Sequence, residues 1–199
     1  MFDDLLRAFK DRLLAPLARA LGPSFPPAVV TLLALAAGGA AAWLAAERSY
    51  GGALVAWLVN RVLDGLDGAL ARVQGSTSDL GAYLDILCDF AVYALVPIGL
   101  IVGAPTPDGW RALAILLASF YLNAASWLYL AALLARRGRS AGQITSVVMP
   151  PGLIAGTETI VFYALFLLLP AYVVPLFLTM AALVLVGVTQ RAVWAGRRL

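Results

Sequence analysis

The chain has 199 residues, of which 62% are hydrophobic and 13% are charged, and its net charge is +3. A soluble domain is nearer half apolar and a quarter charged, so this composition excludes an ordinary cytosolic globule. One cysteine and no histidine exclude a disulfide scaffold, the usual zinc site and acid–base chemistry that depends on histidine. Any bound metal should therefore be a hard ion held by carboxylates.

The first twenty residues predict an amphipathic helix. Over residues 2–20, apolar side chains recur at helical spacing from Phe2 to Leu17, and charged residues occupy the other face. Early charges such as Asp3 and Lys10 are not expected in a signal peptide. We therefore expect the helix at 2–20 to lie in the membrane surface.

Six apolar segments follow, each close to the roughly 20 residues that cross a bilayer. Their ranges are 28–46, 52–71, 80–102, 110–134, 147–169 and 172–192. The connections are short and rich in turn residues, which leaves no room for a second domain. The predicted fold is all-α, a single membrane domain over 1–199 with a six-helix bundle at 28–192. The run Ala36–Ala42 is typical of close packing between spans.

The basic residues predict the orientation of this bundle. If the N-terminus is cytosolic, Arg48 and Arg111 fall outside and Arg61 lies within the second span. The rest of the 14 Lys and Arg residues then fall on the cytosolic side. We expect a multi-pass protein of a bacterial cytoplasmic membrane with both termini cytosolic. Topology and attraction to anionic lipid explain the positive charge without a nucleic-acid partner.

Four aspartates stand at the ends of the second and third predicted spans, on either side of one short loop. They are Asp64, Asp67, Asp85 and Asp89. Their spacings of three and four residues place each pair on one helix face. Charge at membrane depth is expensive and indicates a functional site. Because converging carboxylates repel one another, we expect them to bind one or two divalent ions, Mg²⁺ or Mn²⁺.

Other interpretations of these aspartates stay open. A pair of aspartates on a helix is often a solvated face, and a cation or proton path through a transporter also uses buried carboxylates. A calcium loop fits poorly, because glycine and leucine occupy ligand positions in the run Asp64–Gly68. Membrane aromatic prenyltransferases use aspartate-rich helices too, but they need a larger bundle than this chain provides.

The same residues resemble the signature of the CDP-alcohol phosphotransferase family, DxxDGxxARx8GxxxDxxxD. Every defined position is present, in the order Asp64, Asp67, Gly68, Ala71, Arg72, Gly81, Asp85 and Asp89. The resemblance implies transfer of a phosphatidyl group from CDP-diacylglycerol to a small polar alcohol, with release of CMP, in phospholipid biosynthesis. It also implies six spans, a leading amphipathic helix and a homodimer.

The resemblance further implies roles for matching residues. Asp64, Asp67 and Asp85, with Asp89 beside them, would hold a pair of Mg²⁺ or Mn²⁺ ions. Asp89 would also take the proton from the acceptor hydroxyl. The nucleotide and diphosphate of the donor would lie against Asp67, Gly68, Ala71, Arg72, Ser78 and Gly81.

The sequence says less about the acceptor alcohol than about the donor or the metal. Glu158 interrupts an apolar span, so it should face a wet cavity and contact hydroxyl or ammonium groups. Arg136, Arg137 and Arg191 would suit an acceptor phosphate, and equally they would serve as topology charges. Two alternative functions remain: transfer of a phospho-amino-alcohol from its CDP form to diacylglycerol, and transport of a small cation or proton.

Overall fold

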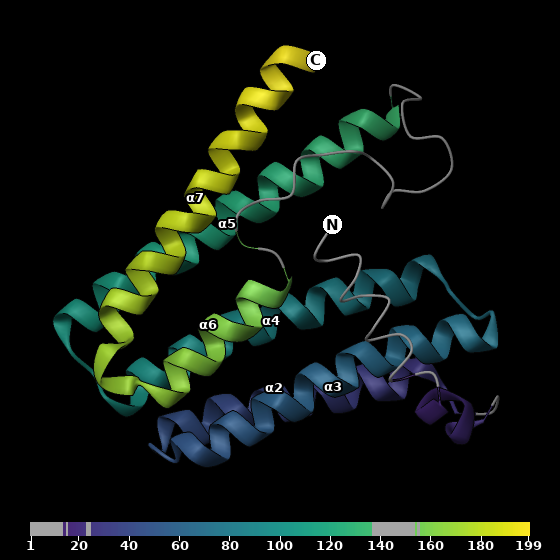
Figure 1. Cartoon of the computed structure of the whole chain (residues 1–199), viewed down its shortest axis with the longest axis horizontal. Helices are drawn as coiled ribbons and strands as arrows, with labels where there is room; N and C mark the ends of the chain where they lie inside the picture. The colour runs from purple at the N-terminus through teal and green to yellow at the C-terminus, as the bar shows by residue number, and fades with distance from the viewer. Residues whose placement is uncertain (1–13, 15, 23–24, 137–153, 155) are drawn as a thin grey trace. The chain divides into compact units, whose positions relative to one another are not determined.

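The computed structural model describes residue 14 and residues 16–22, 25–136, 154 and 156–199, and every regular element in these ranges is helical (Figure 1). The helices are α2 (Pro27–Ala46), α3 (Tyr50–Gln74), α4 (Asp79–Gly103), α5 (Pro107–Arg136), α6 (Gly156–Leu168), the short 3₁₀ helix η2 (Pro170–Tyr172) and α7 (Val173–Arg198). The predicted all-α fold class is confirmed.

Four segments of the described chain are long and apolar enough to cross a membrane: Pro27–Ala46, Asp79–Gly103, Pro107–Arg136 and Pro170–Arg198. α3 has the length, at 25 residues, but it carries Arg61 and the first two aspartates of the signature. α6 has 13 residues. Within the predicted fifth span, 147–169, α6 covers residues 156–168, and most of the earlier part lies outside the described residues.

Most of the predicted surface helix at 2–20 also lies outside the described residues. Residue 14 and residues 16–21 are helical. Leu14 and Ala18, one helical turn apart, are buried against Val30, Leu66 and Leu70. The end of this segment thus packs on α2 and α3 through one apolar stripe.

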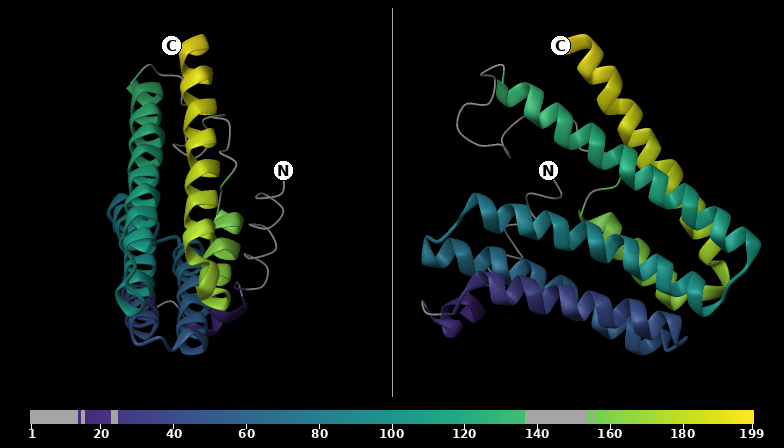
Figure 2. Two further views of the ribbon diagram at one scale, coloured as in Figure 1. Left: turned by 90° about the vertical axis from the view of Figure 1, so that its left-hand side faces the viewer. Right: turned by 180° about the vertical axis from the view of Figure 1, so that it is seen from behind.

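The chain divides into two compact units, and the prediction of one membrane domain stays a prediction. The first contains Met1–Thr106 and Tyr163–Pro170, and the second contains Pro107–Phe162 and Ala171–Leu199. Within the first unit α2 packs along both α3 and α4, and within the second α5 packs along α7 (Figure 2). The aspartate signature lies wholly in the first unit.

Small residues allow α2 and α4 to approach closely. A Cβ atom at Gly99 would overlap the carbonyl oxygen of Ala42. A Cβ atom at Gly103 would come within 2.7 Å of the carbonyl oxygen of Ala45. The predicted role of the 36–42 run in close helix packing is confirmed, because Ala41 and Ala42 are buried in this contact region.

A loop of residues 75–78 joins α3 to α4 and sets the two halves of the signature side by side. α3 stops at Gly75, whose φ of +63° is the left-handed conformation that glycine adopts without strain. Ser78 then caps α4, its Oγ accepting a hydrogen bond of 3.1 Å from the N–H of Gly81. Gln74 ties this end to the start of α2 by donating to the carbonyl oxygen of Phe25 at 2.9 Å.

The α2–α4 contact yields a direct test. We expect Gly99→Ala to lower the free energy of unfolding by about 1–3 kcal/mol, because the added methyl group must displace the backbone of α2. Thermal unfolding of the purified protein in detergent measures this. Gly39→Ala is the matched control, since a Cβ there meets no atom within 4 Å. Equal melting temperatures for the two variants would contradict the packing argument.

Candidate active site

Six of the eight signature residues line a pocket of about 440 Å³ in the first unit. The pocket is bounded by the start of α2, the end of α3 and the start of α4. All six residues predicted to contact nucleotide and diphosphate line the pocket: Asp67, Gly68, Ala71, Arg72, Ser78 and Gly81. Asp85 and Cys88 line it as well. Its volume lies in the range of sites that take small molecules.

Asp67 is held at this pocket by hydrogen bonds from two elements. The Oγ1 of Thr31 on α2 donates to its Oδ2 at 2.7 Å, and the N–H of Gly68 donates to its Oδ1 at 2.6 Å. The residue is only 5% exposed, so these donors compensate a carboxylate removed from water. Sequence reasoning missed Thr31, whose only signal is a lone hydroxyl one turn after Pro27.

Asp64 and Asp89 instead contact Arg61, which lies buried on α3. Nη2 of Arg61 donates to Oδ1 of Asp89 at 2.8 Å, and Nη1 lies 3.6 Å from Oδ2 of Asp64. The hydroxyl of Tyr93 accepts from Nη1 at 3.0 Å and donates to Oδ2 of Asp89 at 3.4 Å. Sequence analysis left Arg61 without a role, although its position three residues before Asp64 was a signal.

Aromatic rings enclose the guanidinium of Arg61. It lies 4.7 Å from the ring centroid of Trp57 and 5.2 Å from that of Tyr93, within the range of cation–π contact. Tyr163, from the part of α6 in the first unit, stacks on Trp57 with centroids 4.6 Å apart. Its hydroxyl donates to the carbonyl oxygen of Tyr93 at 2.5 Å. This ring cluster could not be read from helical spacing.

The four aspartates are thus two pairs and not one cluster. Asp67 and Asp85 line the pocket, whereas Asp64 and Asp89 contact Arg61. Among the described residues, no group of three acidic or cysteine side chains lies close enough together to hold an ion. Arg61 therefore compensates part of the charge that the sequence predicts a metal would neutralise. Asp67 and Asp85 still fit a hard cation, since they present oxygen ligands to one cavity.

The predicted acceptor residues belong to the second unit or lie outside the described residues. Arg191 is buried, and its guanidinium donates to Oδ1 of Asn123 and, at 3.3 Å, to Oγ of Ser126. It therefore joins α7 to α5. Arg136 is exposed at the end of α5, and Arg137 lies outside the described residues. Their role as acceptor ligands stays a prediction.

Glu158 does not stand in the middle of an apolar helix as the sequence suggests. It lies in the first turn of α6 and is exposed. The N-terminal end of a helix carries partial positive charge, which favours a carboxylate there. Glu158 was assigned to a wet cavity because a carboxylate facing lipid is costly. At an exposed first turn that cost is smaller, so the argument for the cavity is weaker.

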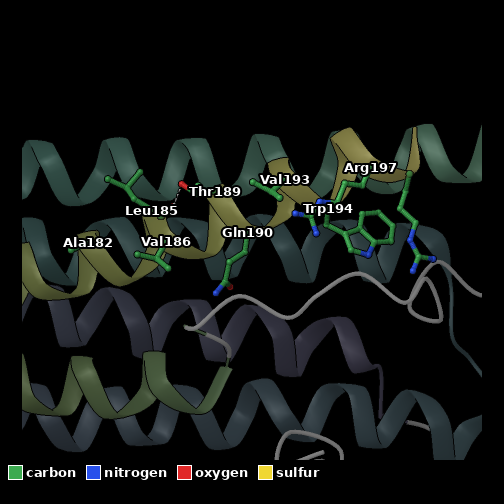
Figure 3. A pocket seen from close by; sticks show the side chains of 9 residues that line it. Ala182, Leu185, Val186, Thr189, Gln190, Val193, Trp194 and Arg197 are labelled. Carbon is green, nitrogen blue, oxygen red and sulfur yellow. Dashed lines mark hydrogen bonds between the residues drawn. The ribbon is translucent and has the colours of Figure 1, made fainter.

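A second hollow, of about 800 Å³, runs along α7 in the second unit (Figure 3). Leu185, Val186 and Val193 line it, with Trp194 and Arg197 toward the end of the helix. Thr189 does not offer its hydroxyl proton to this hollow, because Oγ1 donates to the carbonyl oxygen of Leu185 at 2.9 Å. Its described lining contains none of the predicted site residues, so the candidate site is the smaller pocket.

The sequence profile of the CDP-alcohol phosphatidyltransferases matches residues 25–193, a range that includes the whole signature and most of both units. The chain belongs to the CDP-alcohol phosphatidyltransferase family. It is a membrane enzyme, a transferase of phospholipid synthesis.

Two curated relatives resemble this phosphatidyltransferase in sequence. The inner membrane protein YnjF of Escherichia coli (strain K12) is 42% identical over 156 residues, which cover 75% of this chain and 73% of YnjF. The CDP-diacylglycerol–serine O-phosphatidyltransferase of Mycobacterium leprae is 31% identical over 97 residues. That match covers 47% of this chain and only 32% of the mycobacterial enzyme.

Solved structures share the fold. The phosphatidylinositol phosphate synthase PgsA1 of Mycobacterium tuberculosis with CDP-DAG bound has a TM-score of 0.70 and 22% identity, over 91% of this chain and 92% of that one. The same synthase in complex with manganese and citrate has a TM-score of 0.70 and 23% identity, over 91% and 88%. At this identity the likeness shows the fold alone.

Cys88 allows the pocket of this phosphatidyltransferase to be tested without mutation. It is the one cysteine of the chain and it lines the pocket. We expect CDP-diacylglycerol with Mg²⁺ to slow alkylation of Cys88 by about tenfold at ten times the ligand's Kd, because only the empty pocket reacts. Mass spectrometry of the intact protein follows the reaction.

The control for this labelling places the thiol elsewhere. The control variant carries Cys88→Ala and Ser49→Cys. Residue 49 lies in the turn between α2 and α3, at the other end of α2 from the pocket. Its alkylation should not respond to the donor. An unchanged rate at Cys88 with saturating donor would show that the donor binds elsewhere.

Proposed function

We propose that this enzyme transfers the phosphatidyl group of CDP-diacylglycerol to the hydroxyl of a small polar alcohol and releases CMP, with Mg²⁺ or Mn²⁺ as cofactor. One observation carries the proposal. The six residues that the resemblance to the family assigns to nucleotide and diphosphate line, with Asp85, a single pocket. Membership of the family, and the fold shared with a synthase structure that has CDP-DAG bound, support the same donor.

The pocket suits a diphosphate. Arg72 lines it and offers a planar set of N–H donors that matches phosphate oxygens. The first turn of α4 borders the same space through Ser78, Leu80 and Gly81, and the positive end of a helix favours an anion. Gly68 leaves space for the arginine, since a Cβ there would lie 3.3 Å from Nη1 of Arg72.

The carboxylates of the signature would hold the divalent cofactor, as the pair of ions that the resemblance to the family implies. Asp67 and Asp85 face the pocket, and Asp64 and Asp89 stand beside them on the same two helices. When bound, the metal neutralises diphosphate charge and stabilises the departing CMP.

Asp89 would take the proton from the acceptor hydroxyl. Its Oδ1 is engaged by Arg61 at 2.8 Å, whereas Oδ2 accepts only a long contact of 3.4 Å from Tyr93. Oδ2 is therefore the oxygen to which the proton moves. As it moves, the acceptor oxygen bonds to the phosphorus distal to cytidine, the bond from that phosphorus to CMP breaks, and CMP leaves.

We also infer that the pocket opens to the cytosol, where CDP donors are made. Arg72 lines the pocket, while Arg48 lies at the other end of the first unit and donates to the carbonyl oxygen of Gly103 at 2.5 Å. In the topology predicted from the sequence, most of the 14 Lys and Arg residues, Arg72 among them, fall on the cytosolic side, which supports this orientation.

The test of the function is CMP release from radiolabelled CDP-diacylglycerol in detergent, with a panel of small polar alcohols. We expect release that stops with excess EDTA and returns with Mg²⁺ or Mn²⁺, because the diphosphate charge then remains uncompensated. Full turnover in EDTA would exclude the metal. Release only from a CDP-amino-alcohol with diacylglycerol would favour the alternative donor, and a transporter would release no CMP.

The roles of the aspartates can be separated by substitution. Asp89→Asn should lower kcat by roughly 10²–10⁴-fold while donor binding persists, because a missing base affects mainly the chemical step. Asp64→Asn should lose turnover and donor binding together, because it would hold metal. Asp79→Asn is the control, on the exposed first turn of α4 and outside the pocket lining. A wild-type rate for Asp89→Asn would remove it from the mechanism.

The acceptor assignment of Glu158 is tested by kinetics with two substrates. If its carboxylate contacts the acceptor, Glu158→Gln should raise the acceptor KM by roughly tenfold and leave the donor KM unchanged. Glu47→Gln is the matched control, since Glu47 is the other glutamate of the chain and is exposed between α2 and α3. A lower melting temperature with both KM values unchanged would make Glu158 structural and favour the Arg136, Arg137 and Arg191 set.

A further inference from the structure

Arg61 lies outside the signature, yet it contacts two of the signature aspartates. We propose that Arg61 is a positioning residue, whose guanidinium holds the carboxylates of Asp64 and Asp89 in a fixed relation across α3 and α4. The inference rests on the proposed function, because it gives Arg61 its effect through the base Asp89.

Each nitrogen of the guanidinium has its own partner. Nε donates to Oδ1 of Asn60 at 2.8 Å, and Nη2 donates to Oδ1 of Asp89 at 2.8 Å. Nη1 donates to the hydroxyl of Tyr93 at 3.0 Å and lies 3.6 Å from Oδ2 of Asp64. Hydrogen bonds from all three nitrogens thus fix the orientation of the guanidinium plane, and a rotation of this side chain would break several contacts at once.

The partners of Arg61 are themselves held by neighbouring helices of the first unit. Asn60 donates from Nδ2 to the carbonyl oxygen of Ala34 on α2 at 2.7 Å. Trp57 stacks against both the guanidinium and Tyr163. With Arg61 only 7% exposed, water does not compete for these contacts. The guanidinium is therefore a fixed reference point for the two carboxylates.

This geometry orients Asp89 for one task. Because Nη2 engages Oδ1, the carboxylate is prevented from turning that oxygen toward a substrate, and Oδ2 is left for the acceptor proton. Arg61 also places positive charge between two carboxylates that would otherwise repel. A small displacement of a reacting group can reduce a rate by about 10²-fold, so such orientation has kinetic value.

A lysine separates positioning from mere charge balance. Arg61→Lys keeps a buried cation, but an ammonium is a point charge that cannot direct separate N–H groups in a plane at two carboxylates. We expect kcat to fall by roughly 10–100-fold, the range for residues that orient a reacting group. The KM for CDP-diacylglycerol should change less than kcat, because Arg61 does not line the donor pocket and the lysine keeps a cation beside Asp64.

The matched control is Arg111→Lys. Arg111 forms an ion pair of 3.0 Å with Asp108, also three residues away, but the two side chains are 77% and 75% exposed. Its kinetics should equal those of the parent enzyme. Melting temperatures in detergent, measured on both variants, separate loss of rate from loss of fold.

A double-mutant cycle tests whether Arg61 acts through Asp89. If it does, adding Arg61→Lys to Asp89→Asn should cause no further loss of rate, because the oriented carboxylate is already gone. Arg61→Gln, which also removes the charge, extends the series if that variant folds. If the Arg61→Gln variant does not fold, Arg61→Lys alone gives the complete test.

Three results would overturn the inference. They are a wild-type kcat for Arg61→Lys, a loss confined to the KM for CDP-diacylglycerol, and additive losses in the cycle. Absence of CMP release by the parent enzyme with every acceptor would contradict the proposed function and this inference together. An active parent with an unaffected Arg61→Lys variant would contradict this inference alone.

Discussion

The contacts between Arg61 and the carboxylates of Asp64 and Asp89 are the interaction on which the candidate site depends. Carboxylates in an apolar bundle need compensation, and a buried guanidinium with directed N–H groups provides it while fixing their orientation. Asp67 is compensated differently, by the hydroxyl of Thr31 and the N–H of Gly68. The four aspartates therefore differ in their surroundings. Arg61 orients Asp64 and Asp89, whereas Asp67 and Asp85 line the pocket.

Glycine serves opposite purposes at the two ends of the first unit. Toward the end of α4, Gly99 lets the backbone of α2 come into contact, which tightens the bundle. At the start of α4 and the end of α3, Gly68, Ala71 and Gly81 leave space, and the pocket opens there. Tight packing at one end holds the helices whose other ends form the site. A substrate can therefore be bound between helix ends without loosening the α2–α4 contact.

Local spacing predicts much of this molecule, and contacts between distant segments explain the rest. The apolar runs predict α2, α4, α5 and α7, and the signature spacing selects the residues that line the pocket. The hydroxyl of Thr31 lies 36 residues from its partner Asp67, and that of Tyr163 lies 70 residues from its partner Tyr93. No helical period relates such residues. Arg61 lies within a helical turn of Asp64, but its contact with Asp89 depends on how α3 meets α4 and could not be predicted from spacing.

The most direct measurement is an experimental structure of the enzyme with Mn²⁺ and CDP-diacylglycerol, in which the anomalous signal of manganese locates the metal. The account predicts manganese at Asp67 and Asp85 with Asp64 beside it, the cytidine diphosphate portion against Gly68 and Arg72, and Asp89 still bonded to Arg61. Manganese or donor density away from the α3–α4 pocket, with the donor bound and the enzyme active, would contradict the assignment of the site.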